Sequence, residues 1–118
     1  MNIQNNSVMR TSMLTGKHVH NHDNEDIGSI EDIVLDLNKG RIAYAVLSFG
    51  GLMGLGNKLF AIPWEALQLD ANQEYFLLNV SKEKLESAQG FEKDNWPDIA
   101  NPAWGTQVYS YYGFEPYW

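Results

Sequence analysis

Three apolar stretches decide the fold: GSIEDIVLD at residues 28–36, GRIAYAVLSF at residues 40–49 and LFAIPWEAL at residues 59–67. Each stretch is rich in β-branched and aliphatic residues, and turn signals separate the stretches at short intervals. Asn38-Lys39-Gly40 forms a tight turn between the first two. Pro63 ends the third strand because proline cannot donate a hydrogen bond to a ladder. This pattern predicts a small all-β barrel or sandwich.

The first stretch has a break in its alternation. Three side chains share one face by the period of two: Ile33, Leu35 and Leu37. Ile30 falls on the opposite phase, and a β-bulge near Glu31 or Asp32 would return it to the core side. The second stretch is apolar on both phases. It therefore predicts a central strand that is covered on both faces.

The flanking segments complete a barrel of about six short strands. A weak strand is expected at residues 17–21, and residues 68–70 are expected to pair with residues 74–80. Trp64 begins a single helical turn. Ser81 caps a short helix that follows the barrel, over residues 81–88. A second helix is predicted at residues 102–112, and it carries an apolar stripe: Trp104, Val108, Tyr111 and Tyr112.

In order and spacing, the three stretches resemble the PRC-barrel domain, and the likeness covers roughly residues 13–85. Asn95-Trp96-Pro97 and Tyr117-Trp118 resemble the extension of short stand-alone bacterial members. The resemblance implies a small mainly β barrel that acts as a docking module, and it implies no catalytic residue. Relatives include the cytoplasmic domain of the photosynthetic reaction-centre H subunit and a domain of a ribosome maturation factor. A role in ribosome assembly follows from family analogy alone.

The chain divides into three expected parts. We expect a flexible tail at residues 1–12, the PRC-type barrel at residues 13–89 and an aromatic extension at residues 90–118. The extension is so rich in Trp, Tyr and Phe that it must bury part of its surface. Two surfaces can receive it, its own barrel or a second subunit. The sequence leaves that choice open, and we expect a homodimer.

Charge and composition restrict the function. The 118 residues include 15 acidic and 8 basic ones, so the formal net charge of −7 argues against nucleic acid as a partner. The absence of cysteine excludes thiol catalysis and cysteine metal sites. The longest apolar run, residues 42–47, is too short to cross a membrane, and the N-terminal stretch has no apolar signal region. We expect a cytoplasmic protein that is not inserted into a membrane.

The chain shows no catalytic constellation, so we expect a non-enzymatic docking protein without a cofactor. The residues expected to contact a protein partner are apolar side chains outside the predicted strands: Leu52, Met53, Leu55, Trp104, Tyr111 and Trp118. The alternative is a metal- or ligand-binding protein. Three histidines alternate along the first strand and would share one face, where they could bind Zn²⁺ or Cu²⁺: His18, His20 and His22.

Overall fold

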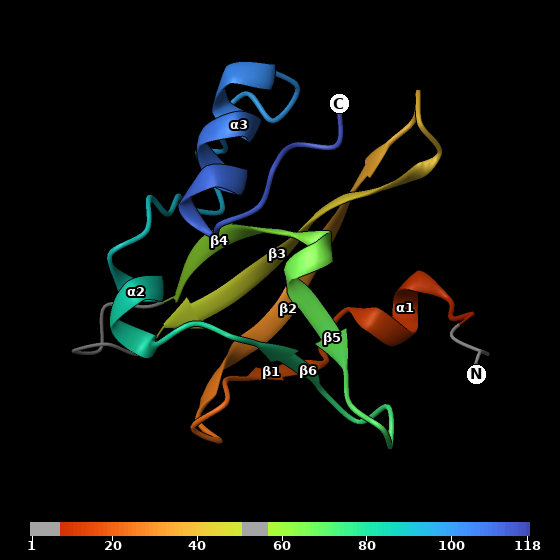
Figure 1. Ribbon diagram of the computed structural model, residues 1–118, viewed down its shortest axis with the longest axis vertical. Helices are drawn as coiled ribbons and strands as arrows, with labels where there is room; N and C mark the ends of the chain where they lie inside the picture. Colours follow the sequence, from red (N-terminus) through yellow and green to blue (C-terminus); the bar gives the residue numbers. More distant parts are fainter. Residues whose placement is uncertain (1–7, 51–56) are drawn as a thin grey trace.

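The computed structural model describes residues 8–50 and 57–118. In this part of the chain, six strands form one curled sheet, a half-barrel, in the order β4-β3-β2-β1-β6-β5 (Figure 1). The strands are β1 (His18–His20), β2 (Asp26–Asp36), β3 (Arg41–Gly50), β4 (Asn57–Pro63), β5 (Leu67–Leu69) and β6 (Phe76–Leu78). The β1–β6 pair is parallel and the other pairs are antiparallel. The predicted small barrel with short helices after it is confirmed.

Short helices join and follow the strands. They are α1 (Thr11–Leu14), the 3₁₀ turn η2 (Trp64–Ala66), α2 (Lys82–Glu86) and α3 (Pro102–Tyr111). The Ser81 hydroxyl accepts a hydrogen bond from the Lys84 amide at 3.0 Å and caps α2. Asn101 caps α3 through the Ala103 amide at 3.0 Å. The two predicted helix starts are therefore confirmed. Part of the segment that we assigned to an N-terminal tail lies in α1, where Leu14 is buried.

The concave side of the sheet encloses the main core. Its central members come from β1, β2, β3, β4, β6 and α2: Val19, Ile27, Ile30, Leu47, Ile62, Leu78 and Leu85. The convex side of β3 and β4 is also covered, because α3 and the residues after it pack against it. Residues 43–49 of β3 are buried throughout. The prediction of a strand covered on both faces is confirmed.

The predicted bulge is present in β2. The β2–β3 register jumps between Ile30 and Asp32, so Glu31 is the extra residue, and Ile30 is buried on the core side. A second irregularity lies nearer the hairpin tip. Val34 pairs with Tyr44 and Leu35 pairs with Ile42, which leaves Ala43 without a register partner in the described strands β2 and β4.

Two of the expected core residues are in fact exposed. The sequence placed Leu35 and Leu37 beside Ile33 in the core, but their exposed fractions are 54% and 85%. The reason is geometric. β1 pairs with β2 only at Asp26 and Ser29, so the far end of the β2–β3 hairpin projects beyond the rest of the sheet (Figure 1).

Candidate functional site

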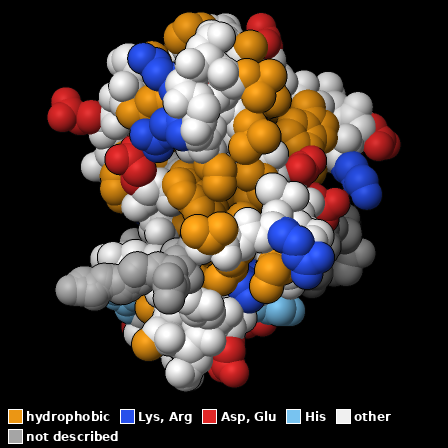
Figure 2. Space-filling model, turned by 90° about the vertical axis from the view of Figure 1, so that its right-hand side faces the viewer, with side chains coloured by type: hydrophobic (Ala, Val, Ile, Leu, Met, Phe, Trp, Pro, Cys, Tyr) orange, Lys and Arg blue, Asp and Glu red, His pale blue; other side chains and the backbone are white. Residues whose placement is uncertain are grey.

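A groove with both apolar and polar lining residues lies between the projecting hairpin and the C-terminal extension. Its volume is about 370 Å³. One wall comes from β2 and its turn, and the other wall from residues 99–102 and the last two residues. Four of its lining side chains are large, apolar and at least 36% exposed: Leu35, Leu37, Ile99 and Trp118. Hydrophobic side chains also gather across the middle of the face toward which the hairpin points, with charged side chains around them (Figure 2).

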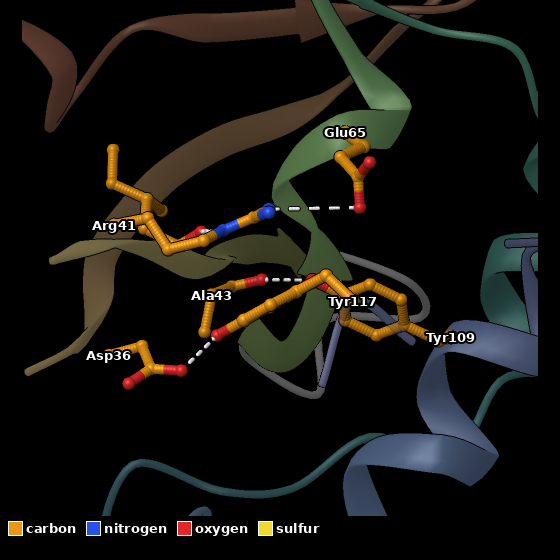
Figure 3. A network of polar contacts seen from close by, with 7 residues as sticks. Asp36, Arg41, Ala43, Glu65, Tyr109 and Tyr117 are labelled. Atoms are coloured by element: carbon orange, nitrogen blue, oxygen red, sulfur yellow. Dashed lines mark hydrogen bonds and ion pairs between the residues drawn. The ribbon is translucent and has the colours of Figure 1, made fainter. Parts of the chain in front are cut away.

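A polar network fixes the two walls to each other (Figure 3). The Tyr117 hydroxyl donates to Asp36 Oδ2 at 2.5 Å, which joins the extension to the end of β2. The Arg41 guanidinium lies 3.7 Å from the centre of the Tyr117 ring, a cation–π contact. Arg41 also pairs with Glu65 at 3.7 Å. These contacts tie the end of the extension to the base of the hairpin turn.

The protonation states of this network favour its bonds at neutral pH. The hydrogen bond from Tyr117 and those from the backbone amides of Lys39 and Asn38 hold the pKa of Asp36 below its usual value. Burial, together with the adjacent Asp36 carboxylate, raises the pKa of Tyr117 above its usual value. The carboxylate is therefore charged and the phenol keeps its proton. The donor and the acceptor are both in the required state.

Tyr109 anchors helix α3 to the sheet. Its side chain has no exposed surface, and its hydroxyl donates to the Ala43 carbonyl at 2.8 Å. Ala43 is the residue without a register partner at the second irregularity, so the tyrosine bonds the backbone where the pairing is interrupted. The Trp118 ring meets Tyr109 edge-on, with 5.0 Å between ring centres. A Cβ at Gly105 would lie 2.8 Å from Trp118, so this close packing requires glycine.

Tyr44 of β3 lines the groove, and its hydroxyl lies against Gly105 of α3. The residue is 3% exposed, and its hydroxyl has no hydrogen-bond partner among the residues that the structure describes. Burial raises the pKa of Tyr44 to about 12, so the hydroxyl stays protonated at neutral pH. This hydroxyl is not one of the buried side-chain atoms without a partner, which in the described residues are His20 Nδ1 and the Tyr112 hydroxyl oxygen.

The structure separates the residues that the sequence proposed for partner contacts. Leu52, Met53 and Leu55 lie outside the described residues. Trp104 and Tyr111 line a smaller hollow of about 160 Å³ beside α3, whereas Trp118 lines the groove. The Tyr111 hydroxyl also donates to the Lys84 carbonyl at 2.6 Å.

Most of the groove was not predictable from the sequence pattern. Leu35 and Leu37 were assigned to the core, Ile99 was not named, and Tyr117 was named only as part of the C-terminal Tyr-Trp motif. The position of Leu37 could have indicated its exposure, because it immediately precedes the turn at residues 38–40.

The three alternating histidines lie in different surroundings. His18 pairs with Asp26 at 2.8 Å, and the His20 ring stacks on Tyr75 with 4.2 Å between ring centres. His22 is exposed and lies beyond the end of β1, in the turn that the Asn21 side chain holds. Across residues 8–50 and 57–118, no three His, Asp or Glu side chains are grouped so that they could hold a metal ion.

The fold and the groove define a small β-barrel domain with an added helical extension. A family model, the PRC-barrel domain, matches residues 7–85, and the chain belongs to this family. The family's domain is a generic, non-catalytic interaction module. A search of curated proteins found no match to the chain. No helix within the described residues is long and apolar enough to span a membrane.

The family match ends at Leu85, before the extension begins. The hairpin wall of the groove therefore belongs to the family domain, and the opposite wall does not. The groove is a feature of this chain's combination of barrel and extension.

Proposed function

We propose that this chain is a non-enzymatic protein-docking module, and that the groove between the β2–β3 hairpin and the extension is its docking surface. One observation carries the proposal: four large apolar side chains stay exposed around a single groove whose walls are tied together by a polar network. Isolated exposed apolar residues are common, but several around one groove are typical of interaction sites.

The geometry favours docking over chemistry. Two polar side chains hold the walls of the groove together: Asp36 accepts from Tyr117, and Arg41 covers the Tyr117 ring. A carboxylate whose pKa is lowered is also a weak general base at neutral pH. The groove therefore offers four exposed apolar side chains on walls that are tied together, which suits the capture of a partner's side chains.

A capture experiment with matched variants tests this proposal. The tagged protein is compared with the double variant Leu35→Ser/Leu37→Ser by quantitative mass spectrometry after purification from cells of the native host. Met13→Ser is the control, because Met13 is also exposed, at 46%, but does not line the groove. We expect the same partner with the wild type and with Met13→Ser, and its loss with the double variant. Equal capture by all three proteins would reject the groove as the docking surface.

The same experiment addresses the loop residues expected from the sequence. A variant with Leu52, Met53 and Leu55 replaced by serine is carried beside the groove variant. If only the loop variant loses the partner, docking belongs to the loop. Sedimentation of each protein alone reports whether the chain forms the homodimer that we also propose.

A further inference from the structure

We infer that an aromatic pocket beside the β4 edge of the sheet binds a neutral carbohydrate. This inference goes beyond the proposed docking function, because in the described part of the chain the pocket shares no lining residue with the groove. Its volume is about 400 Å³, within the range of about 300–1,000 Å³ of small-molecule pockets. Its lining includes three aromatic rings and four polar side chains: Phe91, Trp96 and Trp104, with Lys58, Gln89, Glu92 and Asn95.

Backbone hydrogen bonds hold two of the rings in place. The segment between α2 and α3 passes the edge of the sheet (Figure 1), and there the amide and the carbonyl of Phe91 pair with Leu59 of β4 at 2.9 Å each. The Asn95 amide then donates to the Glu92 carbonyl at 2.9 Å and closes a tight turn. This turn sets the Trp96 ring beside that of Phe91, with 5.0 Å between ring centres and 56° between their planes. The two rings therefore form a fixed corner.

The aromatic side chains supply flat apolar contact area. Trp104, from the first turn of α3, and Phe91 pack against the buried cluster around Tyr109. Phe91, Trp96 and Trp104 are each partly buried, so each keeps part of its surface accessible in the pocket. The face of an aromatic ring is partially negative, and the face of a sugar ring that carries C–H groups packs well on it. The pocket therefore suits a ligand with flat, C–H-rich faces.

The polar side chains of the pocket offer both donors and acceptors. Within the described residues, the side chains of Lys58, Gln89, Glu92 and Asn95 make no hydrogen bond or ion pair. The ammonium group donates, the carboxylate accepts, and the two amides do both. Hydroxyl groups of a sugar also donate and accept, so they can pair with the whole set. Lys58 and Glu92 carry opposite charges that cancel in the lining, which favours a neutral ligand over an ion.

A proline-rich peptide is the other kind of ligand that aromatic-lined surfaces commonly bind. Its carbonyl groups accept hydrogen bonds, but its prolines have no N–H to donate. Such a peptide would leave the Glu92 carboxylate and the amide oxygens of Gln89 and Asn95 without a donor. We therefore favour the carbohydrate, and the peptide is one of the outcomes of the test.

A glycan array that carries neutral and acidic glycans tests the inference. The labelled full-length protein is compared with Trp96→Ala, which removes one ring of the corner. Trp118→Ala is the control, because Trp118 is the exposed tryptophan of the groove and does not line this pocket. We expect the wild type and Trp118→Ala to bind the same neutral glycans, and Trp96→Ala to lose them. Binding to no neutral glycan, or equal binding by all three proteins, would overturn the inference.

Each glycan that binds is then titrated in solution by calorimetry. Asn95→Ala removes an exposed amide without touching the packing of the rings, so it keeps the test valid if Trp96→Ala fails to fold. We expect Asn95→Ala to weaken binding by roughly two- to tenfold. The matched control Asn72→Ala, in an exposed turn outside the pocket, should bind as the wild type does. Affinity should stay the same as salt rises from about 50 to about 300 mM, because the ligand is neutral. Unchanged affinity for Asn95→Ala, or binding that salt weakens, would contradict the stated recognition.

Two further measurements separate the pocket from its alternatives. The peptide decaproline is titrated into the wild type and Trp96→Ala. If decaproline binds in a manner that depends on Trp96 while no neutral glycan binds, the pocket is a peptide site and the inference fails. The groove variant Leu35→Ser/Leu37→Ser is expected to bind glycans as the wild type does. Loss of glycan binding in that variant would place the site at the groove and overturn the inference, whereas failure of the glycan experiments leaves the docking function of the groove unaffected.

Discussion

Replacing Tyr109 with phenylalanine removes one hydroxyl from a side chain that has no exposed surface. The ring remains, so the edge-on contacts with Tyr44 and Trp118 are kept. The loss is confined to the 2.8 Å hydrogen bond to the carbonyl of Ala43, a residue without a register partner in the described strands. Leaving such a buried acceptor unsatisfied costs about 1–3 kcal/mol. At roughly 4 °C per kcal/mol for a domain of this size, the melting temperature should fall by about 4–12 °C.

The matched control is Tyr44→Phe on the facing side chain. The two rings meet edge-on with 5.6 Å between their centres, and both residues are almost completely buried. The Tyr44 hydroxyl has no hydrogen-bond partner among the described residues, so its removal should leave the melting temperature unchanged or raise it. Circular dichroism and calorimetry at neutral pH measure both variants. A Tyr109→Phe protein that melts with the wild type, or an equal loss in Tyr44→Phe, would refute the reasoning.

Three further predictions concern the same sheet. Burial raises the pKa of Tyr109 from 10.0 to about 12. The protonated Tyr109 side chain therefore stabilises the fold fully below pH 10, and this stabilisation is lost as the pH rises to about 12. Urea titrations over this pH range should show a smaller fall in the free energy of unfolding for Tyr109→Phe than for the wild type. Gly105→Ala places a Cβ 2.3 Å from the Tyr44 hydroxyl oxygen. It should therefore lower the free energy of unfolding in chemical denaturation, although alanine favours a helix by about 1 kcal/mol over glycine. The destabilisation should be smaller when Tyr44 is also replaced by phenylalanine, which removes the clashing oxygen. Gly28→Ala combines a φ of +127° with a Cβ 2.4 Å from the Ser48 carbonyl oxygen, so cooperative melting should be lost, and a wild-type melt would contradict this.

The two bulges show which parts of the register could be predicted from the sequence. Glu31 was predictable as the extra residue because Ile30 stands out of phase with the apolar residues that follow it. The bulge at Ala43 was not, because β3 is apolar on both phases and a shift of one residue leaves the hydrophobic pattern unchanged. The alternation of apolar residues also placed Leu35 and Leu37 in the core, although both are exposed. Alternation predicts which side chains share a face, but not where the neighbouring strand ends.

The apolar stripe of α3 also shows that periodicity alone does not identify the buried side chains. The sequence favoured the face of Trp104 and Val108, but the fully buried side chain is Tyr109, one position further along α3. Tyr, Trp and Val occur on more than one face of this helix, so periodicity does not identify the buried face. Gly105 offered a signal, since it lies four residues before Tyr109 and marks where the helix approaches the sheet closely.

A single carboxylate sets the geometry of both groove walls. Asp36 is the last residue of β2, and its Oδ1 accepts the backbone amides of Asn38 and Lys39 at 3.0 Å each, which fixes the turn that presents Leu37. Its Oδ2 accepts the Tyr117 hydroxyl, which fixes the extension. Because these bonds lower the pKa of Asp36, the charge that they require is present at neutral pH and is lost only in acid, as the pH falls through the lowered value. The groove therefore depends on a polar residue that an occupant does not need to touch.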